Sequence, residues 1–574
     1  MLLKKYKVIH LRKMEYNFSI IIIIIMILHY SMPSSAVISS YIYQHSSYAY
    51  YHHHRYTHNH HYYYHHLPLY SFVSKRRRLH KQTLLLSSSS TYNIGSDRSN
   101  PVHGSNNNNI NTYTADKNVK KSFTYNNNNK ITNNNNFVVN YRNQKTYAGW
   151  NDEDIQANML LLQVDKLNND LENFTKNLKT FASGTDDKVD LSSVILPIIS
   201  DWNYQDQLTP DKISDWLWSL GKLGFKCFNP KHKLICMDLI HRFCMTTSLT
   251  SRQVTTSFGG FQKMGMKWSS MNPEDKHNFI DIISSTCSSL NSRELPNLFY
   301  SLCKLGVRWE DMSNNLQDGL IDSFMKHSSE LKSQQGSMSI YSLGLLGLKI
   351  DDIVDSSIID TIYAVSSSVL SDSHGNENNK FFSQQCSNVI YGLAKLGVQS
   401  ITCPIDAKIQ KTLLEMMAYM NDQEVANTVY SLGIMGTKWN QLSLETRRII
   451  EESSISKLSR MIPQGLSNTV YGLGIMECSW VDMSDTFKFA IQDAINANFN
   501  ARVLLPSKNS QAVANVIYAL GLLGAVWDEY PISVRKSLTE GLILGGPYFN
   551  SQEVSNVYYG YAYYYYYYCY YYYY

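Results

Sequence analysis

Apolar residues between positions 186 and 562 recur at the spacing of amphipathic helices. In one segment Val425, Val429 and Leu432 fall on one helical face, and Gly436 follows directly after the apolar run. A glycine at this place is typical of a helix C-terminus. A second amphipathic segment, such as 442–458, then precedes the next copy. The pattern predicts pairs of helices, and no segment of this region shows a strand signal.

The glycine-terminated helix of each pair, which we call the B helix, repeats the motif Asn-x-x-Tyr-(Ser/Gly/Ala)-Leu-(Gly/Ala)-x-(Leu/Met)-Gly, and the other amphipathic segment is the A helix. The aromatic positions are 41, 41, 41, 50, 39, 41, 47 and 41 residues apart. A fixed period of this size is typical of solenoids, because neither helix of a pair can bury its apolar face alone. We therefore predict an all-α fold, an α-solenoid of about nine stacked hairpins. The aromatic positions are Trp218, Tyr300, Tyr341, Tyr391, Tyr430, Tyr471, Tyr518 and Tyr559, with Gly259 in the second copy.

Local signals define the ends of each B helix. Ser and Asp side chains near the start are predicted to accept hydrogen bonds from free first-turn amides; these are Ser292, Ser383, Asp422, Ser510 and Ser551. Glycines are predicted just beyond the end, at Gly224, Gly265, Gly306, Gly347, Gly397, Gly436 and Gly524. The tryptophans that follow are predicted to be buried: Trp268, Trp309, Trp439, Trp480 and Trp527. The longer steps contain polar insertions, 371–380 and 498–510, which we expect to be loops.

Charge divides the chain into a basic leader and an acidic remainder. Residues 1–150 contain 18 Lys and Arg against 3 Asp and Glu, a net charge of about +15. The whole chain carries +5, so residues 151–574 carry about −10. An acidic array counts against a binder that relies on strong contacts with phosphate.

The leader resembles a two-part targeting sequence. Residues 1–36 combine lysines and arginines, an apolar run at 20–28 and small residues, as a signal peptide does. The apolar run is too short to span a bilayer, so we expect no stable membrane insertion. Residues 37–150 are low in acidic residues and rich in Ser, Tyr, His and Asn, which predicts a disordered, transit-like region. Together the two parts predict import into a plastid (chloroplast), with the mitochondrion as the alternative.

The rest of the chain divides into a helical lead-in at 151–185, the array at 186–562 and a poly-Tyr tail at 563–574. The nine cysteines form no C-x-x-C pair and no Cys/His cluster, which indicates a reducing compartment without structural zinc. The histidines between 52 and 66 lie in low-complexity tracts, so we predict no metal site. We also predict no cofactor.

No motif for phosphate loops, nucleophilic elbows or zinc hydrolases occurs in the sequence. The chain is therefore predicted to be a binding protein and not an enzyme. In a solenoid, one repeat position forms a column along the stack, so binding residues are sought by column. Two readings are open for the main basic column: contact with a phosphate backbone, or complementing the dipole at helix C-termini. This basic stripe lies eight residues after the aromatic position and contains Lys226, Lys267, Arg308, Lys349 and Lys438; a second column, four residues after it, contains Lys222, Lys263, Lys304 and Lys395.

Two uncharged columns are expected to stabilise the fold. An asparagine lies three residues before the aromatic position in most copies, where its constancy predicts a buried ladder of hydrogen bonds between helices and argues against base reading. The tyrosines can stack on bases, but their core-like spacing favours packing. The asparagines are Asn297, Asn388, Asn427, Asn468, Asn515 and Asn556.

The motif resembles the octotricopeptide-type repeats of algal organelles. It is also similar to the helical arrays that precede the RAP domain in organellar RNA-processing factors, and to helical-repeat subunits of mitochondrial RNA-editing complexes. The resemblance covers residues 186–562, but the proline-rich element of octotricopeptide units and a RAP-like domain are missing. It implies binding of single-stranded organellar RNA in transcript processing, stability or translation, with possible protein partners in an RNA-processing complex. The alternative is a protein–protein interaction scaffold that uses the concave face of the solenoid.

Overall fold

A computed structural model describes residues 110–113, 123–126, 130–132, 138–140, 152–186, 190–200, 208–246, 248–371, 379–500 and 506–573. The chain divides into two compact units, Met1–Ile110 and Asn111–Tyr574, and the account below concerns the second. The predicted targeting segment, the histidine tract and most of the transit-like region lie outside the described residues.

Four short strands precede the helices, within the region expected to lack stable structure. Strand β2 pairs antiparallel with β3, and β3 pairs antiparallel with β4, so that Ile131 lies opposite both Tyr125 and Val139. Short runs of β-branched and aromatic residues favour strands even between asparagine tracts, which explains the difference from the expectation. The strands are β1 (Ile110–Tyr113), β2 (Phe123–Asn126), β3 (Lys130–Thr132) and β4 (Val138–Asn140), in the order β1-β2-β3-β4.

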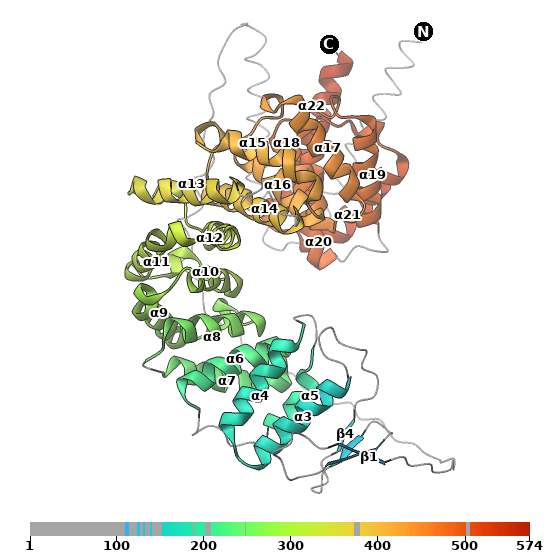
Figure 1. The fold of residues 1–574 in the computed structure, drawn as a ribbon. Helices are drawn as coiled ribbons and strands as arrows, with labels where there is room; N and C mark the ends of the chain where they lie inside the picture. The colour runs from blue at the N-terminus through green and yellow to red at the C-terminus, as the bar shows by residue number, and fades with distance from the viewer. Residues whose placement is uncertain are drawn as a thin grey trace, which may run out of the picture. The chain divides into compact units, whose positions relative to one another are not determined.

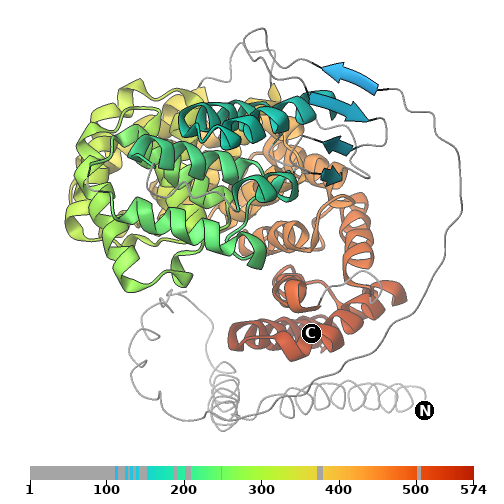
Figure 2. The same cartoon turned by 90° about the horizontal axis from the view of Figure 1, so that it is seen from below.

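The predicted all-α solenoid is confirmed for the array. Among the described residues it forms nine helical hairpins, each with an A helix followed by a B helix, and hairpins adjacent in sequence pack together (Figure 1 and Figure 2). The A helices are α5 (Ser192–Ile199), α7 (Pro230–Cys244), α9 (Pro273–Thr286), α11 (Asn314–His327), α13 (Ser356–Ser371), α15 (Asp406–Met416), α17 (Leu444–Leu458), α19 (Asp485–Phe499) and α21 (Ile532–Gly545). The B helices are α6 (Pro210–Lys222), α8 (Ser251–Lys263), α10 (Glu294–Leu305), α12 (Ser333–Leu346), α14 (Asn379–Leu396), α16 (Asp422–Ile434), α18 (Pro463–Ile475), α20 (Pro506–Leu522) and α22 (Ser551–Tyr573).

The lead-in contains two helices, α3 (Asp152–Leu167) and α4 (Leu171–Gly184). Helix α4 packs on α6 as successive B helices pack on one another. The indole Nε1 of Trp216 donates a hydrogen bond of 2.8 Å to the hydroxyl of Thr175, and the ring centroids of Trp216 and Phe174 are 5.3 Å apart. The row of B helices therefore starts at α4, before the predicted boundary at residue 186.

The C-terminal glycines are confirmed as a column. All seven predicted glycines have a positive φ, between 69° and 96°, a conformation that costs other residues energy. The equivalent position of the seventh hairpin holds Glu477, with φ 59°. The chain therefore reverses direction in the same way after α18, although a glutamate takes the place of glycine.

None of the five predicted caps is correct: the capping side chain lies one residue earlier in α10 (Asn291, not Ser292), α16 and α22, while Ser383 and Ser510 lie inside α14 and α20. The side chain of Asn421, not of Asp422, accepts from the backbone of α16, and Asn550, not Ser551, accepts from that of α22. Each asparagine forms a reciprocal pair with a glutamate three residues later, because the Glu424 and Glu553 carboxylates accept from the cap backbone in return. The asparagine-glutamate pair was the better signal than the neighbouring Ser or Asp.

The polar insertions are partly helical. Helix α13 extends to Ser371 and α14 already begins at Asn379, while α19 extends to Phe499 and α20 begins at Pro506. The expected loops at 371–380 and 498–510 are therefore shorter than predicted, and residues 372–378 and 501–505 lie outside the described part.

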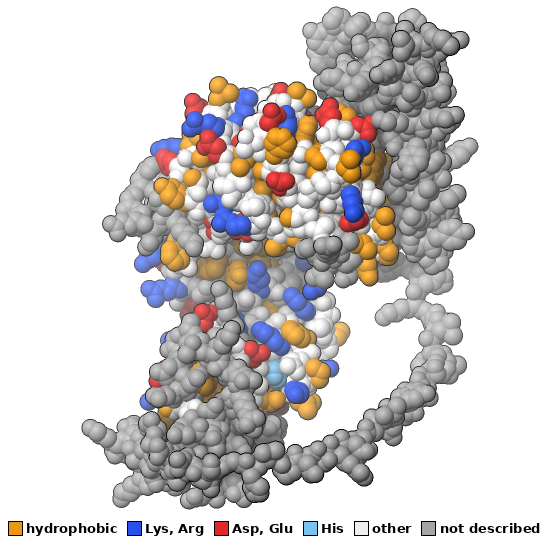
Figure 3. Space-filling model, turned by 90° about the vertical axis from the view of Figure 1, so that its right-hand side faces the viewer, with side chains coloured by type: hydrophobic (Ala, Val, Ile, Leu, Met, Phe, Trp, Pro, Cys, Tyr) orange, Lys and Arg blue, Asp and Glu red, His pale blue; other side chains and the backbone are white. Residues whose placement is uncertain are grey.

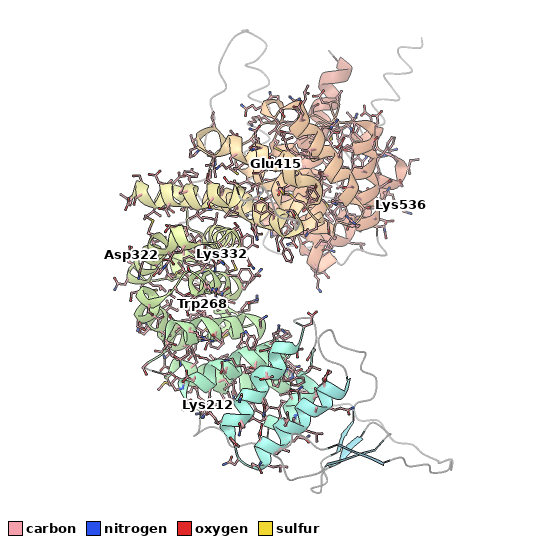
Figure 4. All side chains as sticks on the ribbon, in the orientation of Figure 1. Lys212, Trp268, Asp322, Lys332, Glu415 and Lys536 are labelled. Carbon is pink, nitrogen blue, oxygen red and sulfur yellow. The ribbon has the colours of Figure 1, made fainter. Side chains whose placement is uncertain are left out.

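Tryptophans pack against the turns as predicted at three positions. Trp268, which is labelled in Figure 4, Trp439 and Trp480 are buried, and each lies at or next to a short 3-10 turn or bend that leads into an A helix. The backbone N–H of Trp439 donates to the carbonyl of Met476 at 2.7 Å, and that of Trp480 donates to Leu523 at 2.7 Å. These bonds join each turn to the C-terminus of the next B helix. Among the described residues, no helix has the length and apolarity to cross a membrane.

Close packing of the B helices depends on glycines, because glycine has no side chain to separate the backbones. A Cβ atom on Gly392 would lie 2.5 Å from the carbonyl oxygen of Ile340, and one on Gly472 would lie 2.5 Å from that of Val429. Backbone atoms cannot move aside as a flexible side chain does, so α12 and α14, and likewise α16 and α18, are in direct backbone contact. Similar contacts occur at Gly260 and Gly560.

Candidate functional site

Each B helix exposes one narrow face, which we call the B face. It contains four positions that lie on one side of a helix: seven and three residues before the aromatic position, the aromatic position itself, and four residues after it. The neighbouring positions are buried in the stack. The first position is glutamine in six successive hairpins, all exposed: Gln334, Gln384, Gln423, Gln464, Gln511 and Gln552.

Five tyrosines of the B face form a continuous ladder from α12 to α20. Successive ring centroids are 5.7, 6.3, 6.2 and 5.9 Å apart along Tyr341, Tyr391, Tyr430, Tyr471 and Tyr518. Each ring is half-buried. Burial, together with the neighbouring tyrosines, raises the pKa of Tyr391 to about 12, and burial also raises the pKa of Tyr341 and Tyr430. The ladder is therefore a neutral aromatic surface.

The spacing of the ladder decides how it can contact a ligand. A flat base between two rings needs two van der Waals contacts, so the rings must be about 7 Å apart. The observed separations of 5.7–6.3 Å leave no room for a base between neighbouring tyrosines. A ligand of this stretch must lie across the ring edges.

The asparagine column lies beside the ladder and is not buried. Asn297 is exposed and the other five are half-exposed, which corrects the predicted buried ladder. One bond joins neighbouring copies, from the Asn556 amide to Asn515 at 2.9 Å. The column lies three residues from the tyrosines, so it shares their half-exposed side of the helix and cannot enter the core.

The basic stripe lies at the turns, where most of its members contact protein groups. The Nζ atoms of Lys226 and Lys349 each donate to a carbonyl at the end of the next B helix, on Lys263 and Lys395, at 2.5 Å. Lys438 forms an ion pair of 2.5 Å with Glu477 at the end of α18. The contacts of these three lysines agree with the interpretation that the stripe complements the dipole at helix C-termini.

The other two members of the stripe are exposed. The guanidinium of Arg308 lies 2.6 Å from the Glu310 carboxylate and 3.6 Å from the Asp311 carboxylate. Both carboxylates belong to the same turn and largely balance the charge of the arginine. Lys267 is exposed at the equivalent turn before Trp268. The structure does not bring the five residues together as one uncompensated row of positive charge.

The second basic column lies on the B face itself. Lys222, Lys263 and Lys304 occupy its last position in three successive hairpins. The Nζ of Lys304 lies 5.1 Å from the Tyr300 ring centroid, and that of Lys395 lies 5.3 and 5.2 Å from those of Tyr391 and Tyr430. Burial lowers the pKa of Lys395.

Two arginines that the sequence analysis did not select extend this surface. Arg252 and Arg293 are exposed at the first B-face position of α8 and α10, where later hairpins have glutamine. Helix α6 differs, because Asp211 and Asp215 occupy its first two B-face positions; Asp211 accepts from Gln253, and Asp215 pairs with Lys179 of α4 at 2.6 Å. We call the set of Lys222, Arg252, Lys263, Arg293 and Lys304 the basic B face.

The segment of the sequence that contains α6 to α8 is also rich in positive charge. Residues 216–273 contain eight Lys and Arg and one acidic residue, within an array that is acidic as a whole. On the face drawn in Figure 3, several Lys and Arg side chains lie on the lower part of the described surface, among fewer Asp and Glu side chains. A comparison of one repeat position across all nine hairpins does not reveal this cluster, because the positive charge is confined to the first few hairpins.

Metal-ligating side chains and cysteine thiols of the described part are scattered or buried. No group of three or more His, Cys, Asp or Glu side chains lies together there in a way that could hold a metal ion. The eight described cysteines are free thiols. Burial raises the pKa of Cys287 and Cys303 to about 12, so these thiols stay protonated and unreactive near neutral pH.

Comparison with known proteins gives no family. No model of a protein family matches the chain, and no curated protein matches it. The chain is similar to the crystal structure of an engineered protein at 11% sequence identity, covering 70% of this chain and 92% of that one, with a TM-score of 0.19. At that TM-score the similarity supports no argument about fold or function, which here rest on the chain's own residues.

Proposed function

We propose that the array binds single-stranded RNA, and that the basic B face of α6, α8 and α10 contacts the phosphates. The observation that supports this most is the placement of Lys222, Lys263 and Lys304 at one B-face position in three successive hairpins. Lys and Arg spaced by one repeat follow a chain of phosphates, whose neutralisation dominates the affinity for nucleic acids. The resemblance of the motif to organellar RNA-binding repeats supports the same function in transcript processing, stability or translation.

The placement of the two basic columns predicts different effects on RNA binding. Changing Lys222, Lys263, Lys304 and Lys395 together to Gln should weaken binding of the full-length protein to a mixed-sequence, 20-nucleotide RNA. The slope of log affinity against log salt should become shallower by about 0.7 for each phosphate that the variant no longer neutralises. Fluorescence anisotropy across a salt series measures both quantities.

The basic stripe provides the matched control. Changing Lys226, Lys267, Arg308, Lys349 and Lys438 to Gln removes one more charge, yet it should cost less affinity, because three of these side chains hold helix ends. Its main effect should be a small fall in melting temperature. Equal falls in affinity for both variants would place the phosphates elsewhere, and no RNA binding by the unmodified protein would reject the proposal.

The leader supports an organellar location for this function. A fluorescent reporter fused to residues 1–150 should be imported into a plastid, because the segment joins a signal-like start to a basic, acid-poor region. Import into mitochondria would support the alternative. A reporter spread through the cytosol would contradict both.

A second candidate function is a protein–protein interaction scaffold. The observation in its favour is the uncharged B face of α16, α18 and α20, where Gln, Asn, Tyr and an aliphatic residue take the four positions. Many solenoids bind partners along such a surface. The two candidates use different helices of one array, so they do not exclude each other.

A further inference from the structure

The B face of α14 to α22 differs from the basic B face in both charge and uniformity. Five successive helices carry Gln, Asn and Tyr at the same three positions, and Lys395 is the one charged residue on this face among the described side chains. We call the surface the amide face. It consists of Gln384, Gln423, Gln464, Gln511 and Gln552, with Asn388, Asn427, Asn468, Asn515 and Asn556, and the tyrosines beside them.

The uniformity of the amide face restricts its ligand. A surface that reads a sequence presents different side chains from one repeat to the next, because each position must distinguish a different unit. Here the same carboxamide returns five times, so it suits a polymer whose own hydrogen-bonding unit is identical at every step. A polypeptide backbone is such a polymer, since every non-proline residue presents one N–H and one C=O.

The separation of the repeats matches this ligand. In an extended chain, residues i and i+2 face the same way and are about 6.6–6.8 Å apart. Neighbouring tyrosine rings on the amide face are 5.9–6.3 Å apart. Two residues of extended peptide thus advance by nearly the distance between neighbouring tyrosine rings, and the long Gln side chains can adjust to the remaining difference.

The asparagine amides are placed to make these bonds. Within the described part, the side chains of Asn388, Asn427 and Asn468 are half-exposed and make no hydrogen bond. Asn556 and Asn515 bond directly to each other. A peptide group placed across them would exchange that one bond for two, because each carboxamide offers both a donor and an acceptor.

We propose that the amide face binds an extended, uncharged polypeptide segment of a partner protein, mainly through its backbone. This inference does not rest on RNA binding by the basic B face. RNA suits the amide face poorly, because almost no cation is present to neutralise phosphates and the tyrosine rings leave no room for stacked bases. The tyrosine edges and the aliphatic side chains of Ile434, Ile475 and Leu522 would contact every second side chain of the peptide.

The test uses the full-length protein and a fluorescein-labelled, end-capped peptide of twelve residues that alternates Thr and Gln. We expect binding that changes little with salt, because no ion pairs form. A version of the peptide whose backbone nitrogens are all methylated keeps the carbonyls and the side chains but has no backbone N–H, and it should bind at least about tenfold more weakly. This comparison leaves the protein unchanged, so it does not depend on the folding of a variant.

The matched protein variant changes Asn388, Asn427, Asn468 and Asn515 to Ala. Its affinity for the peptide should fall at least about tenfold, while its affinity for the 20-nucleotide RNA should stay the same. Equal binding of the two peptides, or no binding of the unmethylated one, would overturn the inference while leaving the RNA proposal untouched. A fall in RNA affinity in the asparagine variant, without any peptide binding, would assign the amide face to RNA and also overturn it.

Discussion

Replacing Gly472 by alanine is expected to destabilise the array by about 1–3 kcal/mol, the usual cost of forcing extra atoms into a packed interior. The new Cβ would lie 2.5 Å from the Val429 carbonyl oxygen and 2.8 Å from the Cα of Tyr430. Both are backbone atoms, so α18 must move away from α16. The tyrosine contact between Tyr430 and Tyr471 should loosen as well. Thermal unfolding followed by circular dichroism measures the destabilisation.

The same substitution at Gly465, seven residues earlier in α18, should have the opposite sign. There a Cβ would meet the side chains of Met461 and Ala426 at 3.5–3.8 Å, which is ordinary van der Waals contact. Alanine favours a helix over glycine by up to about 1 kcal/mol, so Gly465→Ala should raise the melting temperature. If Gly472→Ala also raises the melting temperature, helix propensity rather than backbone contact governs the packing of the B helices.

The second large effect is expected at the start of the row. Trp216 is fully buried between α4 and α6 and donates its indole N–H to Thr175. Trp216→Ala should cost about 3–5 kcal/mol, as truncation of a buried aromatic residue does. Stability in a solenoid is a sum of interactions between neighbouring repeats, so hydrogen exchange should rise first in α4 and α6.

Trp218, two residues later in α6, is the control for this prediction. It lies half-exposed at the aromatic position of the B face, so Trp218→Ala should cost clearly less. In the Trp216 variant, an even fall in protection from hydrogen exchange over all hairpins would instead show that the array unfolds as one unit. That outcome would contradict the nearest-neighbour account.

Much of this fold follows from local patterns in the sequence. The period of about 41 residues, the terminal glycines and the apolar faces are all features of a single hairpin. They can therefore be recognised in the sequence without knowing how neighbouring hairpins pack. The glycines with positive φ agree with the prediction at all seven positions. The B-helix lengths follow from the same signals, except where α14 and α20 extend into the insertions and where α22 continues to Tyr573, past the predicted end of the array at residue 562.

The features that were missed involve interactions between hairpins. The role of Lys226 and Lys349 depends on a carbonyl 37 and 46 residues further along the chain, which no column pattern reveals. The half-exposure of the asparagines depends on how closely the B helices approach. The addition of α4 to the row depends on Trp216, whose partner Thr175 lies outside the repeating motif.

The backbone contacts between B helices also have a mechanical consequence. At Gly260, Gly392, Gly472 and Gly560, one helix rests on the main chain of its neighbour, so no side chain separates the two backbones at these points of the pairs α6/α8, α12/α14, α16/α18 and α20/α22. The A helices are separated by side chains that can change rotamer. When the stack flexes, strain should therefore fall on the A layer, while the distance between the two B faces of each of these four pairs stays fixed. The array would bend like an elastic rod whose neutral axis runs along the glycines. A ligand on the B faces would then stay in register as the molecule bends.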